Sequence, residues 1–256
     1  LFSLIAALAA APVVAQPQGD PALAARIRKD YRKIEAKIQV RDGVKLFTSI
    51  YVPRDTTRRY PVLMSRTPYS VAPYGDTLFK TTLGPSGNPK WVDDGYIFVY
   101  QDARGRNFSE GHFREMTPIL EKHEKPTDVD EGTDTYDTIE WLLKNLPTNG
   151  RMGIYGTSWP GFYASASCLS RHPALVACSP QAPMTDIWMG DDDFHGGAFL
   201  LAHNFGFYAG FGRGPRTEPG PDKRYPFTRE SNDAYQFYLG MGPVGPGSRK
   251  YITQGP

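Results

Sequence analysis

Residues 150–162 carry the pattern in this chain that is best suited to covalent chemistry. An apolar run ends in Gly156-Thr157-Ser158, and a segment compatible with a helix follows. Such a strand, sharp turn and helix is typical of a nucleophile elbow, in which the turn exposes a serine hydroxyl that can attack an acyl carbon. Gly156 and Gly161 suit the turn because a Cβ would crowd it. The spacing is Gly-x-Ser-x-x-Gly, not the commoner Gly-x-Ser-x-Gly, so an ordinary turn between a strand and a helix is the alternative.

Alternating strands and helices are expected to position this serine. Short apolar runs predict strands at residues 60–65, 96–100 and 175–179. Residues 132–145 predict an amphipathic helix, because Tyr136, Ile139 and Leu143 share one face. This alternation indicates an α/β domain with a mostly parallel sheet.

The first strands are expected to differ from the rest of the sheet. Residues 38–46 contain two alternating strand halves around Asp42-Gly43, which is a strong signal for a β-hairpin. A hairpin pairs its strands antiparallel, so the sheet should have an antiparallel start. Residues 16–37 before it predict a charged lead-in that is helical or poorly ordered.

Length and composition place the chain among ordinary globular proteins. Its 256 residues allow one large domain, or one domain and part of another. A hydrophobic content of 40% and a charged content of 22% are sufficient for a substantial core. The net charge of +2 and the lack of any Lys/Arg run argue against a nucleic-acid partner.

The two cysteines of the chain are Cys168 and Cys178. We expect both to be buried thiols, one in the helix after Ser158 and one in the next strand, although an oxidising compartment would permit a disulfide. Two cysteines at this spacing do not provide a zinc site, so no metal is predicted.

Residues 1–15 are apolar and rich in small side chains, and the chain begins at Leu1 without a methionine. Val13-Val14-Ala15 fits a small-residue cleavage site, so we interpret this stretch as a truncated secretory signal peptide. A buried helix is the alternative, and about 15 residues are few for a membrane span. No cysteine stands at the cleavage site for a lipid anchor. The expected location is therefore periplasmic or secreted.

Five motifs follow one another in an order that identifies a family. They are Arg66-Thr67-Pro68-Tyr69, residues 101–106 with Ser109-Glu110-Gly111, residues 133–142, the elbow at 150–162, and residues 188–192. This set resembles the α-amino-acid ester hydrolases. More broadly, it resembles the α/β-hydrolase family that includes cocaine esterase, glutaryl cephalosporin acylases and X-prolyl dipeptidyl aminopeptidases. The resemblance covers roughly residues 35–215.

The resemblance implies a role for four residues. Ser158 would be the nucleophile, and the oxyanion would be bound by the backbone N–H of Trp159 and the phenol O–H of Tyr69. Asp192 matches a carboxylate that binds the α-ammonium group of the substrate. From the residues alone, Tyr69 is equally a packing aromatic. For Asp191-Asp192-Asp193, a solvated acidic loop is the alternative.

Two positions depart from the family's pattern. Trp159 stands where a tyrosine is usual, which preserves a backbone donor but reshapes the pocket wall. Asp193 stands where the amino-acid ester hydrolases carry an aromatic residue, which weakens the assignment of the substrate more than that of the reaction.

A catalytic serine needs a base and an orienting acid, which in this fold follow it in the order Asp or Glu, then His. His112 and His123 precede Ser158 and are therefore in the wrong order. His172 ends the following helix, on the order of 20 Å away. His195 and His203 lie in the segment after the last predicted strand, before any further strand that could carry the acid. Asp186 could serve as the acid, but the resemblance places the acid later. We therefore expect the catalytic Asp and His to lie outside these residues.

The resulting domain prediction has four parts. Residues 1–15 are the signal, 16–37 the lead-in, 38–190 the N-terminal part of an α/β-hydrolase core, and 191–256 the incomplete start of a helical cap. The C-terminal jelly roll of the family is expected to be absent from this fragment.

The sequence predicts a secreted serine hydrolase that cleaves esters or amides of small acyl donors, such as α-amino acid esters or β-lactam side chains. An X-prolyl dipeptidyl peptidase or a general carboxylesterase is the alternative within the family. An inactive secreted binding module is the alternative from another class. No metal or organic cofactor is implied, the partner is a small-molecule ester or amide, and the resemblance leaves a homo-oligomer open.

Overall fold

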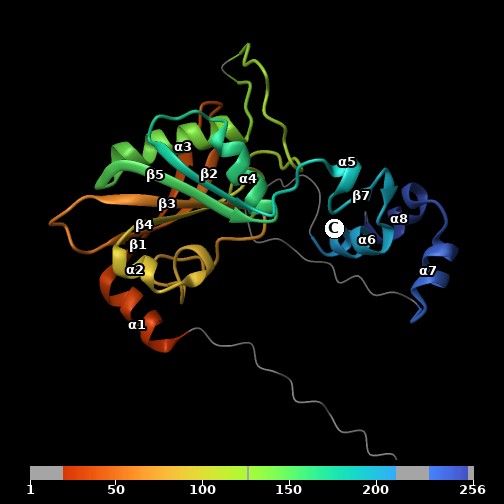
Figure 1. Cartoon of the computed structure of the whole chain (residues 1–256), viewed down its shortest axis with the longest axis horizontal. Helices are drawn as coiled ribbons and strands as arrows, with labels where there is room; N and C mark the ends of the chain where they lie inside the picture. Colours follow the sequence, from red (N-terminus) through yellow and green to blue (C-terminus); the bar gives the residue numbers. More distant parts are fainter. Residues whose placement is uncertain (1–19, 126, 212–230, 253–256) are drawn as a thin grey trace, which may run out of the picture.

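The computed structural model describes residues 20–125, 127–211 and 231–252. Its main sheet has six strands in the order β1-β2-β4-β3-β5-β6 (Figure 1). They are β1 (Tyr31–Gln39), β2 (Lys45–Pro53), β3 (Tyr60–Thr67), β4 (Ile97–Asp102), β5 (Thr148–Thr157) and β6 (Leu175–Gln181). β2 pairs antiparallel with β1 and β4, whereas β4, β3, β5 and β6 pair parallel. The predicted α/β-hydrolase sheet, mostly parallel with an antiparallel start, is confirmed.

Helices cover both faces of the sheet (Figure 1). On one face, α3 (Glu131–Asn145) and α4 (Trp159–Cys168) bury Ile139, Leu142 and Ala164 against the strands. On the other face lie α1 (Pro21–Asp30) and α2 (Lys90–Asp94), and a short 3₁₀ turn (Pro85–Gly87) precedes α2. Because both faces are covered, β2 and β4 are buried along almost their whole length, as is typical of central strands in such sheets.

Local sequence signals explain several element boundaries. Gly43 has a φ of 89° in the turn between β1 and β2, so the predicted hairpin uses the residue that best tolerates this conformation. The helix predicted at 132–145 is α3, and it starts with a capping box between Asp130 and Thr133.

The lead-in is more ordered than the sequence suggested. Residues 21–30 form α1, but β1 starts at Tyr31 and not at residue 38. The charged residues of this stretch concealed the strand, because a lysine ordinarily faces solvent. The ammonium of Lys33 is instead buried, and it donates to the main-chain carbonyls of Pro73, Gly75 and Leu78. The predicted signal peptide at 1–15 lies outside the described residues.

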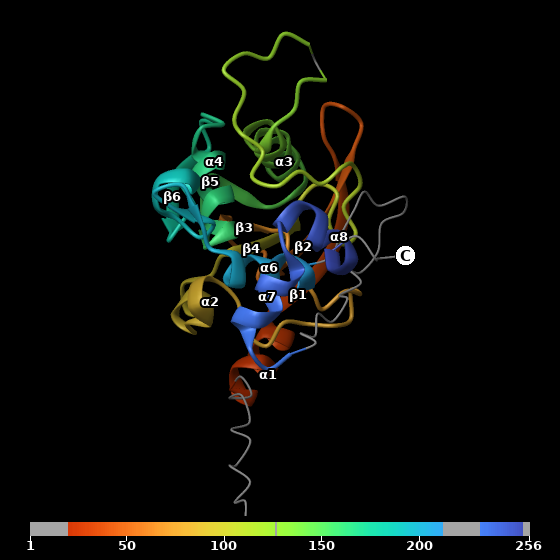
Figure 2. The same cartoon turned by 90° about the vertical axis from the view of Figure 1, so that its right-hand side faces the viewer.

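Beyond β6 the chain forms short elements beside the carboxyl ends of the parallel strands (Figures 1 and 2). They are α5 (Ile187–Gly190), β7 (Phe194–His195), β8 (Ala198–Phe199), α6 (Leu201–Gly210), α7 (Ala234–Met241) and α8 (Val244–Ile252). β7 and β8 pair as a separate antiparallel hairpin. Within the described ranges, no helix combines the length and apolarity needed to cross a bilayer.

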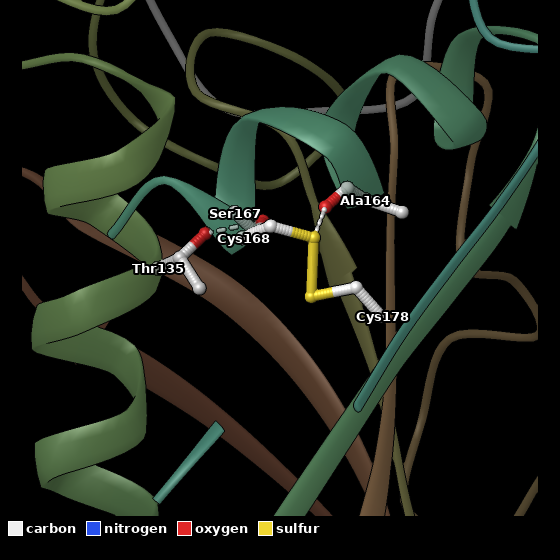
Figure 3. Close-up of a disulfide and its surroundings, with 5 residues drawn as sticks. All are labelled: Thr135, Ala164, Ser167, Cys168 and Cys178. Atoms are coloured by element: carbon white, nitrogen blue, oxygen red, sulfur yellow. Dashed lines mark hydrogen bonds between the residues drawn. A yellow bond between two sulfur atoms is a disulfide. The ribbon is translucent and has the colours of Figure 1, made fainter. Parts of the chain in front are cut away.

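The two cysteines form a disulfide, so the expectation of free thiols was wrong (Figure 3). Cys168 ends α4 and Cys178 lies in β6, on which α4 packs. This packing brings their Cα atoms to 6.2 Å, within the range that a disulfide spans. Nearby, the hydroxyls of Thr135 and Ser167 lie 2.7 Å apart and link α3 to α4. The end of the helix that begins at Ser158 is thereby fixed on both sides.

Candidate active site

Ser158 lies in the turn between β5 and α4 with φ 62° and ψ −126°, a conformation that is rare for a serine. A Cβ on Gly156 would collide with the carbonyl of Pro160, and one on Gly161 would lie 2.5 Å from the carbonyl oxygen of Gln181. Both glycines are therefore required by close backbone approach. The strand, turn and helix predicted for residues 150–162 are present.

The strained turn is held by the neighbouring strand. The main-chain N–H of Ser158 donates to the carbonyl of Gln181 at the end of β6, at 3.0 Å. The hydroxyl of Thr157 donates to the side-chain oxygen of Gln181 at 3.1 Å. Pro160 occupies the first turn of α4, where its missing N–H costs no helical hydrogen bond. These contacts present the Ser158 hydroxyl at the carboxyl edge of the sheet.

Trp159 is the first residue of α4, so its N–H has no acceptor within the helix. The positive end of the helix dipole adds to the attraction of this N–H for a developing oxyanion. The Trp159 side chain is buried and stacks on Phe211, with ring centroids 4.8 Å apart. The tryptophan that replaces the usual tyrosine thus forms an apolar wall between the elbow and the end of α6.

Tyr69 follows β3 and is half-buried beside the elbow. Its ring packs edge-on against Trp159, and its main-chain N–H donates to the hydroxyl of Thr67 at 3.1 Å. Burial raises the pKa of the Tyr69 phenol, and a hydrogen bond with the Ser158 side chain opposes this shift. The phenol therefore stays protonated at neutral pH and retains a proton that it can donate.

Tyr69, Ser158 and Trp159 line one cavity of about 200 Å³. Residues from the loops and from α6 complete its lining; they are Met116, Met184, Asp192, Asp193, His203, Asn204, Phe207 and Tyr208. The four residues that the family resemblance singled out, Tyr69, Ser158, Trp159 and Asp192, therefore lie around the same space.

The acidic wall of this cavity is held by Asn204, which is buried in α6. Its side-chain amide nitrogen lies 3.2 Å from the carbonyl of Asp192 and 3.3 Å from that of Asp193. The carboxylate of Asp191 accepts a hydrogen bond from the Thr185 N–H at 2.6 Å and so stabilises the loop between β6 and β7. Burial, reinforced by the charge of Asp192, raises the pKa of Asp193. Asp192 and Asp193, but not Asp191, therefore line the cavity.

The structure does not join any described histidine to Ser158 by a hydrogen bond. His172 is buried and bonds Glu140 at 2.9 Å, and His123 bonds Asp130 at 3.0 Å. His203 lines the cavity but lies on its acidic side, on the helix that carries Asn204. Asp186 caps α5 by accepting the Met189 N–H. The described residues also contain no cluster of three His, Cys, Asp or Glu side chains able to hold a metal.

Gln181 and Asn204 gave no signal in the sequence, and the motif at 101–106 did not indicate what Arg106 contacts. Gln181, Asn204 and Arg106 act through main-chain carbonyls or N–H groups of residues distant in sequence. The side-chain spacing of residues 201–210 is compatible with a helix, and that pattern could have grouped Asn204, Phe207 and Tyr208 on a cavity wall.

The chain matches the family model described as "X-Pro dipeptidyl-peptidase (S15 family)" over residues 42–238. It is 29% identical over 177 residues to the cocaine esterase of Rhodococcus sp. (strain MB1 Bresler), covering 69% of this chain and 28% of that protein. The chain thus spans less than a third of that relative's length.

Two solved structures match almost the whole chain. An aminopeptidase from the marine sediment archaeon Thaumarchaeota archaeon is 33% identical with a TM-score of 0.74, covering 97% of this chain and 39% of that one. An α-amino acid ester hydrolase is 36% identical with a TM-score of 0.72, covering 95% and 39%. Together with the family match over most of its length and the elbow at Ser158, they establish that this chain belongs to the X-Pro dipeptidyl-peptidase (S15) family.

Proposed function

We propose that the protein is a secreted serine hydrolase that cleaves ester or amide bonds of small acyl donors through an acyl-enzyme on Ser158. The observation that carries this proposal is the strained Ser158, which shares a cavity with Tyr69 at the N-terminus of α4. Backbone strain at a serine in a strand-to-helix turn is typical of an activated nucleophile.

The reaction follows from the positions of the donors. The Ser158 hydroxyl oxygen attacks the carbonyl carbon of the substrate, and its proton passes to a general base. The Trp159 N–H and the Tyr69 O–H donate hydrogen bonds to the carbonyl oxygen and stabilise the negative charge that develops on it. Collapse of the tetrahedral intermediate expels the alcohol or amine, which takes the proton, and water then hydrolyses the acyl-enzyme. In this fold the acid and base follow the serine as Asp or Glu, then His.

The acidic wall supports an acyl group that carries a positive charge. Asp192 and Asp193 line the same cavity as Ser158, and an α-ammonium group would form charge-assisted hydrogen bonds with them. The likeness to an α-amino acid ester hydrolase supports the same class of acyl donor. We include β-lactam side chains that carry an α-ammonium group in this proposal, because the acidic wall would bind them by the same hydrogen bonds.

Dipeptidyl amides and neutral esters are the competing substrates, supported by the family's name and by the cocaine esterase relative. An inactive binding module is the remaining alternative, and it would show no turnover.

Secretion is supported by two observations. Residues 1–15 have the composition of a signal peptide, and the Cys168–Cys178 disulfide is of the kind that persists in oxidising compartments. We therefore propose a periplasmic or extracellular location.

A panel of matched substrates tests the proposal on the full-length protein. Alanine methyl ester and methyl propionate differ mainly by the ammonium group, and Ala-Pro p-nitroanilide reports dipeptidyl cleavage. We expect kcat/KM to be highest for alanine methyl ester, to vanish in Ser158→Ala, and to approach the methyl propionate value in Asp192→Asn. Preference for the anilide would instead assign a dipeptidyl peptidase. Equal rates on both esters would assign a general carboxylesterase.

A further inference from the structure

Arg106 lies in the loop after β4 and is almost fully buried, with 4% of its surface exposed. Its Nε donates to the carbonyl of Pro68 at 2.8 Å, and its Nη2 donates to the carbonyl of Phe211 at 2.9 Å. Pro68 directly precedes Tyr69, and Phe211 directly follows α6. One guanidinium therefore joins the loop of the oxyanion tyrosine to the helix that lines the cavity.

Aromatic rings fix this guanidinium in place. It lies over the rings of Phe211 at 4.2 Å and Phe113 at 4.9 Å, within the range of a cation–π interaction. The Phe211 ring in turn meets Tyr69 edge-on at 5.7 Å and stacks on Trp159. The Tyr69 ring therefore packs against Phe211, and the position of Phe211 depends on the Arg106 guanidinium.

The peptide bond between Pro68 and Tyr69 is held at both of its polar groups. The Tyr69 N–H donates to Thr67, and the preceding carbonyl, that of Pro68, accepts from Arg106. A displacement of about 1 Å in a catalytic group can cost on the order of 100-fold in rate. A contact that fixes this short loop is therefore able to control the rate of the chemical step.

We propose that Arg106 is a positioning residue for the Tyr69 phenol. It fixes the Pro68 carbonyl, orients the phenol toward the oxyanion, and couples this donor to the cavity wall at the end of α6. The inference rests on the proposed function, in which Ser158 is the nucleophile and Tyr69 an oxyanion donor. Lysine cannot replace Arg106, because an ammonium group lacks the planar guanidinium that reaches both carbonyls and stacks on two rings.

Arg104 provides a matched control, because it stands two positions earlier in the same loop. Its guanidinium donates to Asp42 in the hairpin turn at 2.7 Å and to Asp134 in α3 at 2.6 Å. The Arg104 side chain is also largely buried and paired with carboxylates, but its ion pairs lead to the hairpin turn and to α3 and not to Pro68, Tyr69 or α6.

The test is a double-mutant cycle on the full-length protein with a small ester as substrate. Arg106→Lys should lower kcat by about 10-fold or more and change KM by less than about 2-fold, since the contact acts on the transition state. Tyr69→Phe alone should lower kcat by on the order of 10²–10³-fold. In the Tyr69→Phe background, Arg106→Lys should cause no further loss, because the donor that it positions is already absent.

The controls separate this inference from general instability and from failure of the proposed function. Arg104→Lys should retain kcat even where it lowers the melting temperature. If Arg106→Lys does not fold, Phe113→Leu removes one ring beneath the guanidinium, and its smaller loss of kcat should also disappear in the Tyr69→Phe background. Equal losses with and without Tyr69, or unchanged kcat in Arg106→Lys, would overturn the positioning role. Absence of activity from the wild-type protein would instead overturn the proposed function.

Discussion

The main-chain N–H of Ser158 donates to the carbonyl oxygen of Gln181 over 3.0 Å, which ties the strained elbow to the end of β6. The same oxygen lies where a Cβ on Gly161 would have to be. Strand β6 therefore stabilises the serine's conformation and also restricts which residues the following helix can hold. The packing of β6 against β5 and α4 is therefore part of the nucleophile's geometry.

Substitution of Gly161 should disable the elbow without removing any reactive group. In Gly161→Ala the new Cβ would lie 2.5 Å from the Gln181 oxygen, so the strand must move and the bond to Ser158 is lost. We expect kcat/KM to fall by on the order of 100-fold, measured on a small ester. Gly240→Ala in α7 is the matched control, because nothing lies near its Cβ and activity should be unchanged. Wild-type turnover by Gly161→Ala would refute this view of the elbow.

The disulfide should contribute measurably to stability. Cys168 and Cys178 are separated by 10 positions, and closing a loop of this size typically adds about 2–4 kcal/mol to the free energy of unfolding. The double variant Cys168→Ser/Cys178→Ser should unfold at lower denaturant concentration by this amount. Reductant should destabilise the wild type but leave the double variant unaffected. Two free thiols in the native, unreduced protein would contradict the bond.

Asp102 should make stability depend on pH. It is fully buried at the end of β4, and burial raises its pKa to about 6, although the Val71 N–H and the Tyr74 O–H donate to it. The unfolded value is about 3.9, so between pH 4 and 6 the folded state binds more protons. The contribution of this group to the free energy of unfolding is complete below pH 4 and is lost as the pH rises through 6.

Denaturation of the wild type and of Asp102→Asn from pH 4 to pH 7 measures the contribution of Asp102 to the free energy of unfolding. The amide does not titrate, so the wild type should lose up to about 3 kcal/mol relative to the variant across this range. The altered hydrogen bonds of the variant change its free energy of unfolding by the same amount at every pH. Comparing the slopes of the free energy of unfolding against pH therefore removes this difference. Parallel curves would show that the Asp102 carboxyl titrates near its ordinary pKa.

Short-range signals predicted the elements that position the site. The Asp42-Gly43 hairpin, the amphipathic helix at 132–145 and the glycines around Ser158 each depend on residues close in sequence. The strand β1 was partly missed because Lys33 resembles a solvent-facing charge, yet its ammonium is buried by three carbonyls contributed by a distant loop.

Contacts between distant segments could not be predicted in this way. The disulfide depends on how α4 lies across β6, and the contact of Arg106 with Pro68 depends on β4 and β3 ending side by side. The hydrogen bonds of Asn204 could not be predicted, because the groups that it contacts are main-chain carbonyls, which every residue carries. The family resemblance, not periodicity, identified Tyr69 and Asp192.

The central claim is that Ser158 is an activated nucleophile. The most direct measurement treats the full-length protein with a fluorophosphonate probe and locates the adduct by mass spectrometry after digestion, with Ser158→Ala as the control. We predict a single adduct on the peptide that contains Ser158, and none in the control. A folded wild-type protein that remains unlabelled, or that is labelled equally in Ser158→Ala, would contradict the account.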